Sequence, residues 1–159
     1  MNIFFLHLDP KTCAQMHVNS HTVKMCLETA QILSSVHHVT NSTYTPEYKL
    51  SHKNHPCCIW ARESLSNYKW LTQLGLELCK EYTYRYGKIH KCESIIKDLE
   101  QNLPNIPDIG FTKPRQAMPD EYKEEDSVWA YRNYYFYGKE KLHKWKNRNI
   151  PEWMNDYIK

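Results

Sequence analysis

The residues best suited to chemistry form what we call the polar stripe: His17, His21, Lys24 and Glu28. They are spaced by four, three and four positions. An α-helix turns by about 100° per residue, so this spacing would place all four side chains on one narrow face. The pattern is typical of a functional site, but it also suits an ordinary solvated helix face, and the sequence leaves both interpretations open.

Two kinds of site fit the polar stripe. In the first, Lys24 attacks a sugar C1′ or a carbonyl as a neutral amine, Glu28 acts as general base, and His17 and His21 donate protons or contact phosphate. In the second, the two histidines bind zinc with Glu28, or with histidines of a later loop, His52 and His55. Lys24 would repel a cation held between them, so we expect chemistry without a metal or another cofactor.

Basic and aromatic residues suggest contact with a polyanion. The segment 139–148 carries five Lys or Arg residues against one Glu, and it follows a tyrosine-rich stretch, 131–137. Such interleaving suits phosphate contact together with base stacking, although the aromatic residues could equally fill the core. We predict phosphate or nucleic-acid binding by His55, Arg62, Arg85, Tyr86, His90, Lys91, Lys144 and Arg148.

Composition narrows the class of protein. The 159 residues are 41% hydrophobic and carry a net charge of +3, which indicates one folded domain, 1–159, and excludes wholesale disorder. Four glycines and no glycine-rich motif argue against a phosphate-cradling loop. The six cysteines show no Cys-x-x-Cys pair, so we interpret them as reduced thiols in the core of an intracellular protein. We expect neither a signal peptide nor a membrane span.

The pattern of caps and breakers predicts a mostly α, single-domain helical bundle. Asp9-Pro10 should start the first helix, Gly87 should end a later one, and Asp126 should cap the last. The predicted elements are an extended segment over 3–8, a helix over 10–36, a loop over 38–54, a helical stretch over 55–86 that Ser64 or Ser66 could divide, a helix over 88–102, an irregular proline-rich crossing over 103–120, a helix over 127–147, and a tail over 149–159 anchored by Trp153.

Motifs along nearly the whole chain resemble a family of small uncharacterised proteins from phages and large DNA viruses. The matching pieces include Asp9-Pro10, Cys13-Ala14-Gln15, His55-Pro56, Arg62-Glu63-Ser64, Arg85-Tyr86-Gly87-Lys88, Gln116-Ala117-Met118-Pro119-Asp120 and Ala130-Tyr131-Arg132-Asn133-Tyr134-Tyr135. This resemblance implies a viral protein located in the cytoplasm of the infected host cell.

Two further pieces, Ala14-Gln15-Met16-His17 and Arg148-Asn-Ile-Pro-Glu-Trp153, are similar to pyrimidine-dimer DNA glycosylases of the phage endonuclease V type. The resemblance implies a small helical enzyme that acts on DNA. That family uses its N-terminal α-amine, exposed by removal of Met, and an acidic residue on the first helix. Here Asn2 is too large for ordinary Met removal, and the acidic position falls near Lys24. We infer that Lys24 replaces the terminal amine and that Glu28 or the histidine pair replaces the acid.

The sequence leaves three alternative functions open. The first is a metal-free, virus-encoded DNA base-processing enzyme of the glycosylase or lyase type, because extruding a base requires aromatic and cationic side chains. The second is a phosphodiesterase or hydrolase that acts on a small nucleotide. The third is a protein that sequesters a nucleotide or a host protein without turnover. The expected partner is DNA or a nucleotide, with a homo-oligomer possible.

Overall fold

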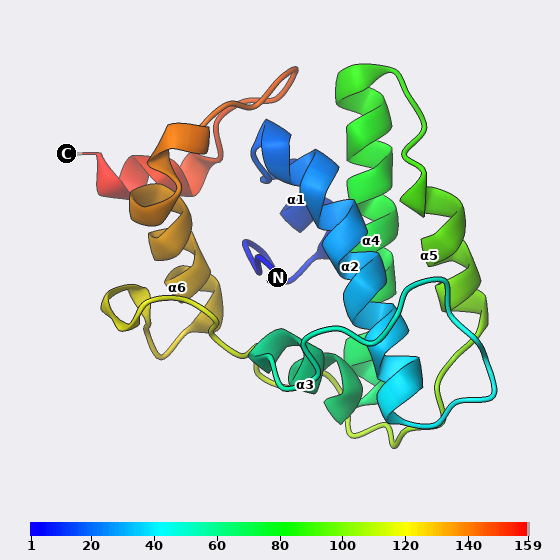
Figure 1. Cartoon of the computed structure of the whole chain (residues 1–159). Coiled ribbons are helices and arrows are strands. Elements are labelled where there is room, and N and C mark those ends of the chain that lie inside the picture. The colour runs from blue at the N-terminus through cyan, green and yellow to red at the C-terminus, as the bar shows by residue number, and fades with distance from the viewer. Residues whose placement is uncertain (159) are drawn as a thin grey trace.

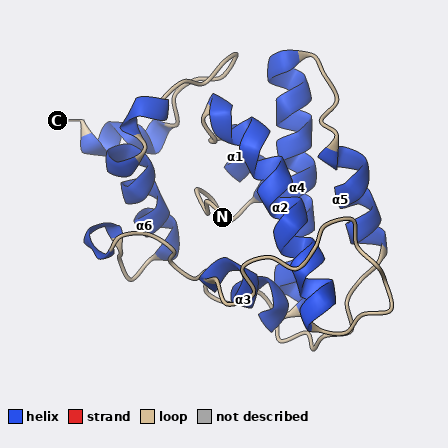
Figure 2. Ribbon diagram, viewed as in Figure 1, coloured by secondary structure: helices blue, strands red, loops and turns tan. Residues whose placement is uncertain are grey.

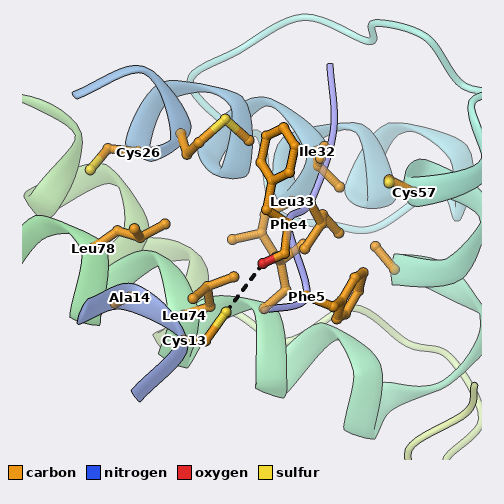
Figure 3. Packing of buried hydrophobic residues seen from close by; sticks show 14 of the residues in the cluster. Phe4, Phe5, Cys13, Ala14, Cys26, Ile32, Leu33, Cys57, Leu74 and Leu78 are labelled. Carbon is orange, nitrogen blue, oxygen red and sulfur yellow. Dashed lines mark hydrogen bonds between the residues drawn. The ribbon is translucent and has the colours of Figure 1, made fainter. Parts of the chain in front are cut away.

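The N-terminal segment runs through the centre of the fold. In the computed structural model, which describes residues 1–158, Ile3–Leu6 are almost fully buried and form neither helix nor strand, and the Leu6 amide donates to the Phe4 carbonyl at 2.9 Å in a tight turn. The Phe5 ring packs against Trp60 and Trp70, with its centroid 4.9 Å from that of Trp60 and 5.1 Å from that of Trp70. The Cys13 thiol donates a hydrogen bond to the Phe4 carbonyl at 3.2 Å (Figure 3). Four consecutive buried apolar residues therefore fix the backbone on which residues 1 and 2 sit.

The first helical region is two helices, α1 (Pro10–Gln15) and α2 (Asn19–Val39), so the prediction of one helix over 10–36 was wrong. Asp9 caps α1 as expected, accepting from the Thr12 amide. The carbonyls at the break find partners far along the chain: Arg85 donates to those of Gln15 and His17, and the Trp145 indole donates to that of Met16. Those partners replace the hydrogen bonds that a continuous helix would have made.

The next two helices, α3 (Pro56–Glu63) and α4 (Leu65–Tyr86), are divided at Ser64, one of the two positions predicted. Ser64 is extended, with φ −152° and ψ 144°. Gly87 ends α4 in the left-handed region at φ +69°, where a glycine costs least.

Helix α5 (Cys92–Gln101) completes a close-packed group with α2 and α4 (Figure 1). At Gly75 on α4, a Cβ atom would lie 2.9 Å from Thr29 of α2 and 3.1 Å from Ile96 of α5. The glycine leaves room for these two side chains to pack against α4 from the neighbouring helices.

The C-terminal part is less regular. After the proline-rich crossing comes α6 (Ser127–Asn133), capped by Asp126 as predicted. A π-turn over Tyr134–Gly138 and a 3-10 turn over Glu140–Leu142 then replace the long helix expected over 127–147. At Gly138 a Cβ atom would lie 2.6 Å from the Tyr134 ring, so the widened turn is packed against its own tyrosine.

The tail ends in a 3-10 helix, Glu152–Tyr157, whose Trp153 is 6% exposed, which confirms it as the anchor. Helices account for all the regular structure of residues 1–158, with no strand (Figure 2). This confirms a mostly α fold in a single domain. None of the described helices is long and apolar enough to cross a membrane.

Candidate active site

The most distinctive arrangement of charges is at Glu28 on α2. Its Oε1 atom lies 3.3 Å from the α-amine of Met1 and accepts the backbone N–H of Asn2 at 3.0 Å. Both groups converge on one oxygen of a side chain that is only 10% exposed. An amine carried by either of the first two residues would therefore lie beside this carboxylate.

The other oxygen of Glu28 is buried and has no hydrogen-bond partner within residues 1–158. The Lys24 ammonium lies 3.7 Å from it, too far for a hydrogen bond but close enough for an ion pair. The Lys24 side chain is 69% exposed, whereas the Met1 side chain is 4% exposed. One carboxylate thus stands between the terminal amine, whose residue packs its side chain into the fold, and a lysine ammonium on a solvated side chain.

Asn2 holds the start of the chain in place. Its side-chain amide donates to the Ala117 carbonyl at 2.9 Å, and its Oδ1 accepts from the Ile3 amide at 2.8 Å and from the Cys57 thiol at 3.3 Å. These contacts tie the amine to the proline-rich crossing and to α3. The amine is positioned by parts of the chain that are distant in sequence.

His55 belongs to the surroundings of this amine. It caps α3, with its Nδ1 accepting from the Cys57 amide at 3.0 Å. Burial lowers the pKa of His55, and the positive charge of the N-terminal amine lowers it further. Both effects disfavour the charged imidazole, so the surroundings of the amine oppose a second positive charge at His55.

The two histidines of the polar stripe do not share a surface with Lys24. His17 lies in the break between α1 and α2, fully buried, and His21 is 4% exposed and stacks on Phe4 at 4.6 Å. The Val18 amide donates to the Tyr135 hydroxyl, and His21 Nδ1 shares a hydrogen bond with the same hydroxyl at 2.7 Å. Burial lowers the pKa of His17 to about 4 and that of His21 to about 3, so both are neutral at pH 7.

Arg85 and Arg148, both predicted to bind phosphate, form ion pairs with Glu81. Arg85 is 2% exposed and donates to Glu81 at 2.8 Å, and Arg148 donates to both Glu81 oxygens at 2.9 and 3.0 Å. Arg85 also holds the carbonyls of the helix break. These guanidinium groups are occupied within the fold.

The remaining predicted contacts are scattered. Arg62 donates to the Lys53 carbonyl at 2.6 Å, and the His90 ring bonds the Val23 carbonyl at 2.9 Å. The ammonium of Lys146 lies over the Tyr86 ring, and Lys91 and Lys144 are exposed. The structure does not bring these residues together with the polar stripe.

Lys139 and Asn2 were missed as site residues, and the α-amine entered only through the family resemblance. The Lys139 ammonium lies 4.9 Å from the Tyr134 ring centre and 5.9 Å from that of Phe4. Phe4 is the ring that stacks on His21, so this cation borders the site. Only the buried run Ile3–Leu6 hinted in sequence that the terminus would be held inside the fold.

Comparison with known protein families gives a match for the N-terminal part of the chain. The sequence model of the family described as pyrimidine dimer DNA glycosylase matches residues 1–94, a stretch that contains Met1, Lys24, Glu28 and His55. Neither a curated protein nor a solved structure matches the chain. Since the match covers 94 of the 159 residues, the protein belongs to the pyrimidine dimer DNA glycosylase family.

Proposed function

We propose that this protein excises pyrimidine dimers from DNA, with the terminal amine as nucleophile and Glu28 as its acid–base partner. The observation that carries the proposal is the pairing of the Met1 amine and the Asn2 nitrogen with one Glu28 oxygen, at 3.3 and 3.0 Å. Because both nitrogens lie there, the proposal holds whether the mature chain carries Met1 or starts at Asn2. Family membership supports DNA as the substrate.

The chemistry requires a neutral amine and a nearby proton acceptor. The amine nitrogen forms a bond to C1′ of a nucleotide in the dimer, and the glycosidic bond breaks with its electron pair leaving on the base, which takes up a proton. The nitrogen then loses a proton to Glu28, and the sugar ring opens with a proton passing to O4′, which leaves a protonated imine. This imine joins enzyme and DNA covalently.

The same carboxylate can serve the lyase step. Removal of a C2′ proton by Glu28 sends electrons toward the imine and expels the 3′ phosphate, which cuts the strand. The unpartnered Glu28 oxygen is the free acceptor for that proton. Its low exposure keeps water from competing for the position.

Lys24 is the rival nucleophile, as the sequence suggested. Its ammonium is within 3.7 Å of Glu28, but its side chain is solvated, and within residues 1–158 no contact holds it apart from that ion pair. The Met1 side chain is packed into the fold, and the neighbouring Asn2 is fixed by three further contacts. Positioning favours the terminal amine, since an oriented nucleophile gains most of its advantage from fixed geometry.

The viral setting and the location in the host cytoplasm are part of the proposal. Their support is the resemblance of the motifs described above to proteins of phages and large DNA viruses. Cell fractionation of an infected host with an antibody against this chain would test both: recovery in the nucleus or outside the cell would contradict the location.

Strand cleavage tests the proposed activity. A duplex with one cyclobutane pyrimidine dimer is incubated with the wild type, Glu28→Gln and a matched control, Glu93→Gln. Glu93 pairs with Lys97 on α5 at the same i,i+4 spacing and 3.8 Å, far from the amine. We expect cleavage at the dimer by the wild type and the control, and a loss of roughly 100-fold or more in Glu28→Gln. Equal rates in all three proteins, or no cleavage by the wild type, would contradict the proposal.

A further inference from the structure

A second group of reactive side chains lies on the opposite side of α2 from the amine, between the three packed helices. Cys26 of α2, Cys79 of α4 and His90, just before α5, place one donor atom each within 4.8 Å of the others. We call this the Cys26–Cys79–His90 cluster. Both thiols are fully buried. The proposed glycosylase chemistry uses none of these residues.

The donor set matches the preferences of zinc. Thiolate sulfur and imidazole nitrogen bind Zn²⁺ at roughly 2.3 and 2.0 Å in a tetrahedral arrangement, which sets neighbouring donors about 3.5–4 Å apart. The cluster is within about 1 Å of that spacing, a distance that side-chain rotation can supply. Hard cations such as Mg²⁺ prefer oxygen ligands and do not suit this set.

The His90 ring is already oriented by the backbone around it. One ring nitrogen lies 2.9 Å from the Val23 carbonyl of α2, and the other accepts the Cys92 amide at 3.0 Å. Histidines that bind metals commonly donate their second ring N–H to a carbonyl, so the Val23 contact is of the kind that holds a ligand in place. An ion bound at the other ring nitrogen would keep the Val23 contact and take the place of the Cys92 amide.

A fourth ligand is available in the same turn. Cys92 follows His90 by two residues, and its thiol is buried just outside the Cys26–Cys79–His90 cluster. Its present partner is the Tyr48 hydroxyl, at 3.5 Å. Rotation of this thiol toward the cluster would complete a Cys₃His set of the structural type.

We propose that Cys26, Cys79 and His90, completed by Cys92, bind one zinc ion that fastens α2, α4 and the start of α5 together. Binding displaces the protons of the coordinating thiols to solvent, which leaves thiolates on the ion. Cys26 lies two residues after Lys24 and two before Glu28. An ion here would therefore stabilise the helix that presents Glu28 to the terminal amine, although it takes no part in the reaction.

Sequence spacing could not reveal this site. Positions 26, 79, 90 and 92 contain no Cys-x-x-Cys pair, and two of the four ligands come from separate long helices. The interpretation of the cysteines as plain core thiols rested on that missing pair, whereas the expectation of metal-free chemistry rested on Lys24 in the polar stripe. Folding is what brings the donors together.

Metal content of the purified protein tests the proposal without any variant. Untagged protein is prepared without chelators, and zinc is counted by inductively coupled plasma mass spectrometry. We expect close to one zinc per chain. After chelation, addition of Co²⁺ should produce the near-ultraviolet band of a cobalt–thiolate bond and visible bands of tetrahedral strength. Less than a tenth of a zinc per chain with no cobalt–thiolate band would overturn the proposal, as would a Cys26–Cys79 disulfide found by peptide mapping.

Variants then assign the ligands. The double variant Cys26→Ser, Cys79→Ser should lose the cobalt–thiolate band and bind at least ten times less zinc. Cys13→Ser, which removes a buried thiol that donates to the Phe4 carbonyl, is the matched control and should keep both. If the double variant does not fold, a chelator should still lower the Tm of the wild type and of Cys13→Ser, and zinc should restore it. A Tm that ignores the chelator, or metal lost equally from the control, would contradict the assignment.

Discussion

At the scale of single residues, the central feature is a carboxylate with an amine on each oxygen. Glu28 faces the Met1 amine through Oε1 and Lys24 through Oε2. Glu93 and Lys97 on α5 form a similar i,i+4 pair with no terminal amine nearby, and the Glu93 side chain is 24% exposed against 10% for Glu28. Substitutions in the two pairs can therefore be compared. Those at Glu93 and Lys97 measure the loss of an ordinary surface ion pair, worth well under about 1 kcal/mol, and those at Glu28 and Lys24 measure the effect of the site.

Lys24→Ala provides the first prediction at this scale. If the terminal amine is the nucleophile, removing Lys24 should lower the rate of strand cleavage no more than about fivefold, since the variant loses only a solvated cation near the DNA. Lys97→Ala should have no effect. Single-turnover cleavage of a dimer-containing duplex measures both rates. A 100-fold loss in Lys24→Ala would assign the nucleophile to that lysine.

His17 gives a prediction on pH. Burial lowers its pKa to about 4 from an ordinary value of 6.5, so the unfolded chain binds this proton more readily than the folded one. Stability is then complete above pH 6.5 and is lost as the pH falls toward 4. At pH 5 this one residue should cost about 2 kcal/mol in the free energy of unfolding.

Urea unfolding at pH 7.5, 6 and 5 measures this loss, with His17→Gln as the comparison. The glutamine amide can still donate toward the Cys13 carbonyl, the partner of His17 Nδ1 at 2.7 Å, but it has no proton to gain. The variant should lose about 2 kcal/mol less than the wild type between pH 7.5 and 5. Identical pH dependence in both proteins would show that His17 is not buried neutral.

At the scale of elements, the break between α1 and α2 decides where the site lies. Because the helix stops at Gln15 and restarts at Asn19, His17 falls between the two helices, and α2 alone presents Lys24 and Glu28. Arg85 of α4 stabilises this break by donating to the carbonyls of Gln15 and His17. One buried guanidinium thus connects α4 to the geometry of the N-terminal region.

Arg85→Gln should accordingly lower the free energy of unfolding by about 3 kcal/mol, because it removes one partner of a buried ion pair and leaves carbonyls unsatisfied. Lys80→Gln is the control: Lys80 pairs with Glu77 on the same helix, but its side chain is 71% exposed. That change should stay within about 0.5 kcal/mol. Chemical denaturation of both variants checks the difference, and a similar small loss in each would refute the bracing role of Arg85.

Local signals predicted several element boundaries and failed where distant contacts decide. The caps at Asp9, Gly87 and Asp126 were visible in sequence because each acts within a few residues. The break after Gln15 depends on partners far along the chain, so periodicity could not show it. Glu28 was predicted as a site residue from its spacing alone. Its contact with the backbone at Met1 and Asn2 could not be predicted, because folding brings these distant residues together.

At the scale of the whole molecule, the site joins residues 1–94, which the family model matches, to the part of the chain that follows them. The N-terminal segment lies between the α1, α2 and α4 group and α6 (Figure 1), with Phe4 and Phe5 contacting Tyr131 of α6 and Arg132 donating to the Leu6 carbonyl at 2.9 Å. The family match ends at residue 94, yet the Ala117 carbonyl that holds Asn2 and the cation Lys139 come from beyond it. Both parts of the chain therefore build the surroundings of the amine.

The charge of the molecule sets its response to salt. The net charge is +3, and Lys139 borders the site over the rings of Phe4 and Tyr134. Binding to a dimer-containing duplex should weaken as salt rises, and Lys139→Ala should reduce the slope of log K against log salt by about 1. Lys97→Ala, on α5, should leave the slope unchanged. Fluorescence anisotropy over a range of salt concentrations measures the slopes, and affinity independent of salt would rule out phosphate contact.

The most direct test of the account is to trap the covalent intermediate and locate it. Wild type is incubated with dimer-containing DNA and sodium borohydride, which reduces an imine to a stable link, and the adduct is digested and sequenced by mass spectrometry. The same data establish which residue carries the mature N-terminus. We predict the DNA remnant on the N-terminal amine, with trapping retained in Lys24→Ala and lost when the amine is acetylated. A remnant on Lys24, or cleavage of the dimer with no trapped adduct, would contradict the pairing of the terminal amine with Glu28 as the catalytic centre.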